Sequence, residues 1–203
     1  MIKTFKCADT QALFKLGRVA RFVNIERAAL RKLKQLDLAR RIEDMRAPPA
    51  NRLEALKGDR TGQWSVRIND QFRLCFRWSE GGAEDVEIVD YHWRSLPMTR
   101  KLKPVSPGEM LAEEFLKPLG MSNYRLAKAI GVPPQRIGDI LAGKRTVTAD
   151  TDLRLCRFFG LSEGWWLRLQ ADYDTEIAKG AMAKTLAKIT PLAGVEVEGA
   201  DVA

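Results

Sequence analysis

The residues best suited to acid–base chemistry form one run near the middle of the chain, at Asp90, Tyr91 and His92. His92 is the only histidine, and because an imidazole titrates near neutrality it can donate or accept a proton. Asp90 can orient that imidazole or act as a base, and Tyr91 can stack on a nucleobase or hydrogen-bond a phosphate. Such groups suit cleavage of RNA without a metal ion.

Cleavage of this kind also needs cations that stabilise the crowded phosphate. Lys57 and Arg73 can supply them, and Arg67 can also grip a phosphate. Arg60 and Arg77 extend the expected RNA-binding surface of the same half. The plain alternative is that a single histidine at a strand end, and arginines along one strand face, are ordinary surface residues.

The elements that must position these residues follow from the periodicity of the first half. Alternating apolar and polar residues predict strands at 2–6, 63–68, 72–78 and 86–91. Helical spacing predicts helices at 10–16, 24–36 and 39–45, and Pro48 prevents further extension. The expected fold is an α+β domain, in which an antiparallel sheet carries helices on one face.

Four stretches of the first half resemble the HigB branch of the RelE-like toxin superfamily. They are LKGDR at 56–60, QWSVRIN at 63–69, FRL at 72–74 and DYH at 90–92. The resemblance spans nearly all of residues 1–92. It implies a small, metal-independent ribonuclease that cuts messenger RNA during translation on the ribosome.

The same resemblance implies a catalytic region, made up of Lys57, Arg73, Asp90, Tyr91 and His92. The family often has a second histidine three residues before the lysine, where this chain has Glu54. This departure disfavours a mechanism with two imidazoles. The division of acid and base roles stays open.

A basic stretch at 93–105, with Pro97 and Pro104, predicts a short exposed linker between two domains. A tether this short gives an effective concentration of about 1 mM if geometry lets the halves meet. Otherwise the halves are expected to pair between two chains. Met98 reads like a fresh N-terminus, so an artificial or read-through join of two neighbouring proteins stands beside a natural fusion.

The second half predicts about five helices within residues 106–175. Ser106 can cap the first, with Pro107 at its first position and Glu109 closing a capping box. Ser122 can cap the second helix. The tail at 176–203 is expected to fray or to be partly disordered.

Ala127, Gly131 and Ile137 have the spacing of a helix-turn-helix, with a small residue at the crossing, a glycine in the turn and an apolar anchor. With five helices, this resembles the XRE-type repressor domain, in particular the HigA antitoxin, over roughly 104–173. The DNA-binding residues that we expect are Gln135, Arg136 and Asp139 for bases, and Lys144, Arg145, Ser122 and Tyr124 for the backbone. The plain alternative is a helical bundle that only binds a protein partner.

Composition agrees with nucleic-acid partners, since the net charge is +8 and the pI about 9.6. Residues 1–97 carry most of the excess, with 19 Lys and Arg against 13 Asp and Glu. Cys7, Cys75 and Cys156 are odd in number and lack metal-like spacing, which predicts reduced thiols in a cytoplasmic protein. We expect neither a metal nor another cofactor, and no membrane segment.

The leading interpretation is a toxin–antitoxin fusion. A messenger RNA endoribonuclease, associated with the ribosome, would be neutralised by or coupled to a half that binds operator DNA. The alternative is a transcriptional repressor that uses a catalytically silent first half for dimerisation or co-repression. We expect a homodimer or higher oligomer, because operators present two half-sites about 34 Å apart.

Overall fold

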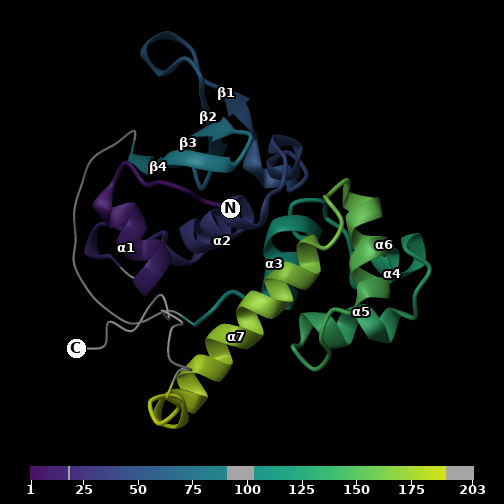
Figure 1. The fold of residues 1–203 in the computed structure, drawn as a ribbon. Coiled ribbons are helices and arrows are strands. Elements are labelled where there is room, and N and C mark those ends of the chain that lie inside the picture. Colours follow the sequence, from purple (N-terminus) through teal and green to yellow (C-terminus); the bar gives the residue numbers. More distant parts are fainter. Residues whose placement is uncertain (18, 91–102, 191–203) are drawn as a thin grey trace.

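The computed structural model describes residues 1–17, 19–90 and 103–190. Figure 1 shows an antiparallel sheet above two helices, with a group of further helices packed beside them. The sheet and its two helices come from the first half of the chain, and the other helices come from the second half. The predicted fold class, α+β followed by all-α, is confirmed.

The sheet has the simple order β1-β2-β3-β4 with every pair antiparallel. Its strands are β1 (Glu54–Ala55), β2 (Gln63–Arg67), β3 (Phe72–Ser79) and β4 (Gly82–Asp90). The helices α1 (Ala8–Leu16) and α2 (Glu26–Leu38) cover one face. Leu33 and Leu36 of α2 pack with Leu74 and Val66 of the sheet, and all four are fully buried. Within the described residues, no helix covers the opposite face of the sheet.

Two predicted elements of the first half take other forms. The strand expected at 2–6 makes only two isolated parallel bridges, from Ile2 to Ala83 and from Phe5 to Val86. The helix expected at 39–45 is a short 3₁₀ turn, Ile42–Met45. The buried carboxylate of Asp44 accepts a hydrogen bond from the Arg40 backbone N–H, which closes this turn locally.

The second half is built from five successive helical rods within the described residues. The first is α3 (Pro107–Met110) continued by a π-helical segment (Leu111–Leu116), and the others are α4 (Asn123–Ala129), α5 (Pro134–Leu141), α6 (Ala149–Phe159) and α7 (Trp165–Leu186). Phe115 centres an aromatic core, with ring centroids 5.2 Å from Trp166 and 6.2 Å from Trp165. Both tryptophans are buried.

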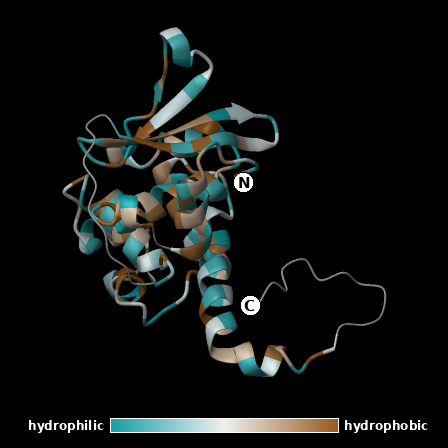
Figure 2. Ribbon diagram, turned by 90° about the vertical axis from the view of Figure 1, so that its left-hand side faces the viewer, coloured by the Kyte–Doolittle hydropathy of each residue, from teal (hydrophilic) through white to brown (hydrophobic). Residues whose placement is uncertain are grey.

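The borders of this half differ from expectation in three places. Helix α7 continues to Leu186, well past the predicted end at 175, and its distal part projects from the body with mixed hydropathy (Figure 2). Val105, expected in an exposed linker, is buried in the core of the second half. Glu109 does not close a capping box, because its carboxylate pairs with Arg27 and Arg31 of α2. Ser106 caps α3 as predicted.

The two halves share apolar packing along the outer side of α2. Leu30 and Leu38 belong to the same buried cluster as Met110, Phe115 and Trp166 of the second half. Arg168 of α7 adds a hydrogen bond to the carbonyl of Leu38 at 3.0 Å. The halves therefore form one packed unit, and separating them would expose part of a core.

Ion pairs surround this apolar contact, with basic residues on the first half and acidic residues on the second. The pairs are Arg27–Glu109, Arg31–Glu109, Arg31–Glu114, Lys32–Glu114 and Lys34–Asp172. In one further contact between the halves, the acidic residue belongs to the first half. Asp44 accepts hydrogen bonds from the backbone N–H and hydroxyl of Ser162, each at 2.9 Å. Charge complementarity thus fixes which face of α2 meets the second half.

The three cysteines are free thiols in this arrangement. Cys75 and Cys156 are buried, and burial raises the pKa of the Cys156 thiol to about 11. Over the described ranges, we find no helix that combines the length and the apolar character needed to cross a membrane.

Candidate nucleic-acid interfaces

The uncovered face of the sheet gathers part of the predicted ribonuclease site. The register of β2 and β3 places Arg67 directly opposite Arg73, and Ser65 opposite Cys75. Side chains on paired positions point to the same face, so Arg67 and Arg73 leave the backbone side by side on this face. The alternation within each strand does not tell which residue of β3 faces Arg67. The strand register shows that it is Arg73.

Arg73 is held by three contacts on this face. Its Nε donates to Ser65 Oγ at 2.9 Å, and its Nη2 donates to Glu54 Oε2 at 2.9 Å and to the Arg52 carbonyl at 3.2 Å. Ser65 is fully buried, whereas the Glu54 side chain is 58% exposed. The guanidinium therefore has a fixed orientation, with one partner that a phosphate can displace.

Sequence reasoning missed the positioning role of Ser65. The sequence does contain a signal for this role. Ser65 and Arg67 are two residues apart in the alternating stretch 63–68, so their side chains point to the same face of the strand. In the sequence, Glu54 only marks a departure from the family pattern. In the structure Glu54 belongs to the short edge strand β1, opposite Ser65, and faces Arg73.

The remaining predicted RNA-binding residues have individual partners. Arg67 pairs with the almost fully exposed Asp70 and lowers the pKa of that carboxyl. Arg60 pairs with Glu87 at 3.2 Å, and Arg77 pairs with Asp85 at 3.5 Å. Lys57 is exposed, just after β1, at the start of the 3₁₀ turn Gly58–Arg60.

Asp90 is placed differently from the other predicted catalytic residues that the structure describes. Its Cα pairs with that of Phe72, whose ring lies in the core on the helix-covered side. Gln71 Nε2 donates to both carboxylate oxygens of Asp90, at 3.0 and 3.1 Å. The strand register thus puts Asp90 and Arg73 on opposite faces of the sheet. Tyr91 and His92 lie outside the described residues.

The second half forms the helix-turn-helix geometry that the spacing predicted. Ala127 of α4 and Ile137 of α5 are fully buried where the helices cross. Gly131 in the connecting turn has φ +67°, a left-handed conformation that favours glycine. Ser122 Oγ caps α4 by accepting from the Arg125 N–H at 3.2 Å.

The predicted DNA-binding side chains lie on the outside of α4, α5 and the following loop. Gln135, Lys144, Arg145 and Tyr124 are exposed. Asp139 contributes its backbone carbonyl, which accepts from the N–H groups of Lys144 and Arg145 at 2.8 and 3.2 Å. Arg136 is half-buried and forms an ion pair with Asp150 of α6, a partner that the sequence did not indicate.

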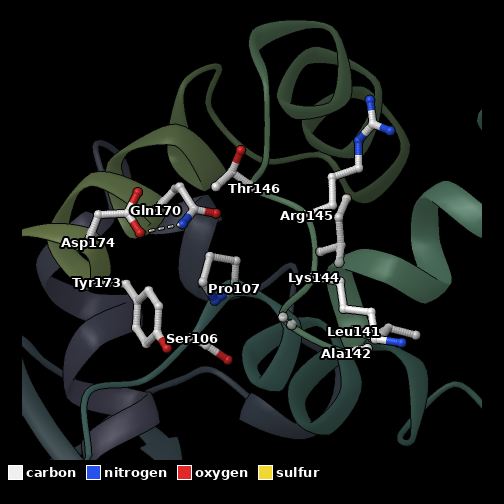
Figure 3. Close-up of a pocket in the computed structure, with 13 residues that line it drawn as sticks. Ser106, Pro107, Leu141, Ala142, Lys144, Arg145, Thr146, Gln170, Tyr173 and Asp174 are labelled. Carbon is white, nitrogen blue, oxygen red and sulfur yellow. Dashed lines mark hydrogen bonds between the residues drawn. The ribbon is translucent and has the colours of Figure 1, made fainter. Parts of the chain in front are cut away.

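Helix α7 supports the basic loop from behind, across a cavity of about 340 Å³ (Figure 3). Gln170 Oε1 accepts from the Val147 N–H at 3.0 Å, while its Nε2 donates to Asp174 at 2.9 Å. In Figure 3 the Arg145 side chain extends away from Pro107 and Tyr173 on the opposite wall. The loop thus presents its cations outward while α7 fixes its backbone.

Comparison with known proteins matches each half separately. Residues 10–92 match the model of the RelE-like toxin HigB of type II toxin–antitoxin systems, and residues 113–166 match a helix-turn-helix model. Virulence-associated protein I of Dichelobacter nodosus is 46% identical over 86 residues, which are 42% of this chain and 80% of that protein.

Two relatives from Vibrio cholerae represent a toxin and an antitoxin. Toxin HigB-1 is 48% identical over 60 residues, which are 30% of this chain and 63% of the toxin. Antitoxin HigA-1 is 36% identical over 74 residues, which are 36% of this chain and 70% of the antitoxin. The chain therefore belongs to the HigB–HigA family of type II toxin–antitoxin proteins, with a HigB-like toxin half and a helix-turn-helix antitoxin half in one polypeptide.

Proposed function

We propose that the first half is a metal-independent endoribonuclease that acts on messenger RNA at the ribosome. The second half, in this proposal, binds operator DNA and also restrains or regulates the endoribonuclease. The observation that carries the ribonuclease proposal is the strand register that places Arg67 and Arg73 at facing positions on the uncovered sheet face. Arg73, oriented by Ser65, and Arg67 beside it can stabilise a phosphate from two sides.

Proton transfer in this proposal uses groups at the edges of that face. The Glu54 carboxylate touches Arg73 and can accept the proton of a 2′-hydroxyl. Lys57 follows β1 and adds a cation, while Tyr91 and His92 follow β4 in the chain. Asp90 acts in this scheme by supporting the end of β4, because its carboxylate belongs to the other side of the sheet.

The described part of the second half docks on α2 and leaves the uncovered sheet face free (Figure 1). Restraint by that part therefore does not work by covering Arg73. It acts on how the first half docks onto a large particle such as the ribosome. We therefore compare two cleavage rates, that of short naked RNA and that of a translated message. The ratio of the first to the second should be higher for the full chain than for an unrestrained enzyme.

The test compares the full chain with Arg73→Ala and with Arg157→Ala, which removes an exposed arginine of α6 far from the sheet. Arg73→Ala is expected to reduce RNA cleavage by about 10²–10³-fold, the range seen when one transition-state donor is lost. Arg157→Ala should cut like the wild type. Cleavage is followed on a labelled RNA and on a message under translation in a cell-free system.

Equal cutting by Arg73→Ala and the wild type would remove Arg73 from the site. If neither RNA is cut at any enzyme concentration while the chain binds DNA, the alternative stands: a repressor with a silent toxin-like half.

The proposal of operator binding rests on the exposed N-terminal turn of α5 and the basic loop that follows it. An α-helix fits the major groove, and residues of its first turn reach base edges. Gln135 and Arg136 occupy that turn, with Lys144 and Arg145 placed for phosphates at its other end. Two copies of the chain would read the two half-sites of an operator.

A further inference from the structure

One side chain of the proposed DNA-reading helix is already restrained before any DNA is present. The guanidinium of Arg136 in α5 forms an ion pair with Oδ2 of Asp150, in the first turn of α6. The other oxygen, Oδ1, accepts a hydrogen bond from Arg154 Nε at 2.9 Å. Arg154 Nη1 in turn donates to the Ile130 carbonyl at the end of α4, at 2.9 Å.

This chain of contacts links all three helices around the turn. Hydrogen bonds from Arg154 and Arg136 lower the pKa of Asp150, so its carboxylate is ionised at neutral pH. The Arg136 side chain is 25% exposed and that of Asp150 is 52% exposed, so both remain accessible at the surface. A negative charge at this place is unexpected for a surface that meets phosphates.

We propose that Arg136 reads a guanine in the major groove and that Asp150 is the residue that positions it. This inference rests on the proposed operator binding and adds to it the base that is read and a positioning residue. An arginine reads guanine by donating two hydrogen bonds to O6 and N7. A free arginine side chain loses rotamer entropy when it is fixed on a base, and a side chain that is held beforehand loses less.

The chemistry of the pair favours guanine over the other possible targets of Arg136. One Nη1 donor is engaged by Asp150, and a guanidinium has five N–H donors in all, so a second edge stays free for two acceptors. Adenine offers one acceptor and one donor there, and the donor faces another donor. A backbone phosphate would be repelled by the Asp150 carboxylate beside it.

The experiment uses the full chain and a duplex enriched by the wild type from a random DNA pool. In this duplex each guanine is replaced in turn by 7-deazaguanine, which lacks the N7 acceptor. One replacement is expected to weaken wild-type binding about tenfold or more, the size of one good base contact. The same replacement should have no effect on Arg136→Ala, because that variant has already lost the contact.

Asp150→Asn tests the positioning role. It should reduce the preference for guanine over adenine at that base pair about fivefold or more, and at the same time raise the affinity for random DNA. The two changes have opposite signs because the variant loses orientation and also loses a charge that repels phosphates. If Asp150 had a purely structural role, Asp150→Asn would lower the affinity for the enriched duplex and the affinity for random DNA together. Glu176→Gln, which removes a carboxylate of α7 outside the DNA-reading turn, should change neither.

Each other outcome overturns the inference in a recognisable way. If Asp150→Asn behaves like Glu176→Gln, Asp150 does not position Arg136. If Asp150→Asn weakens both DNAs equally and lowers the melting temperature, the network only stabilises the fold. If the wild type enriches no sequence from the pool, operator binding itself fails, and the guanine reading fails with it.

Discussion

Glu114→Gln is expected to lower the free energy of unfolding by about 3–5 kcal/mol, because it leaves buried cations without a counter-charge. Glu114 lies between the two halves, where Lys32 Nζ pairs with one carboxylate oxygen and Arg31 Nε donates to the other at 2.7 Å. The side chains of Lys32 and Glu114 are 2% and 4% exposed. Water therefore cannot solvate the ammonium once the carboxylate is gone. Urea denaturation followed by tryptophan fluorescence measures the change.

The neighbouring residue provides a matched control. Glu113→Gln also removes a carboxylate from the same segment, but Glu113 pairs with Lys117 on the surface. Exposed pairs at this spacing contribute about 0.3–0.5 kcal/mol. Adding Lys32→Met to Glu114→Gln should recover part of the loss, because the uncompensated ammonium is removed. If Glu114→Gln lowers the free energy of unfolding no more than Glu113→Gln does, the Lys32–Glu114 pair is not buried in solution.

The same pair makes docking of the halves sensitive to acid. Burial opposes ionisation of Glu114, but Lys32 and Arg31 outweigh it and hold the pKa of Glu114 below its ordinary value of 4.5. A carboxyl with a lowered pKa contributes stability that is fully present above its unfolded pKa and is lost as the pH falls through the folded pKa. The stability difference between wild type and Glu114→Gln should therefore shrink as the pH falls below about 4.5.

Gly108→Ala is expected to destabilise the second half by about 1–3 kcal/mol or more, although alanine normally favours a helix. Gly108 lies in the first turn of α3, buried against the end of α5. A Cβ there would overlap the carbonyl oxygen of Ile140 and come within 2.9 Å of that of Leu141. Both atoms belong to the backbone of the DNA-reading helix, so they cannot move aside as a flexible side chain would.

Gly180→Ala is the control, since a Cβ at Gly180 in α7 meets nothing within 4 Å. There the ordinary preference applies, and alanine should stabilise the helix by about 0.5–1 kcal/mol. The two substitutions are chemically identical and should change the midpoint of urea denaturation in opposite directions. A stabilising Gly108→Ala would show that α3 and α5 are not in backbone contact.

The sequence by itself determined the two halves and the type of each. The alternating stretches 63–68 and 72–78 form strands β2 and β3 in the structure. Ala127, Gly131 and Ile137 lie in a helix-turn-helix, as their spacing predicts. These features depend on local periodicity and on one turn conformation, which neighbouring residues encode. The Ser106 and Ser122 caps were predictable for the same reason.

Only the tertiary structure decided which residues meet across the chain. It paired Arg67 with Arg73 and put Asp90 on the other side of the sheet, because strand register depends on partners far apart in sequence. It redirected Glu109 from a helix cap to Arg27 and Arg31, since a strong cation partner outweighs a local hydrogen bond. It placed Asp150 beside Arg136. Each of these contacts joins residues that no local pattern connects, so periodicity and propensity do not specify it.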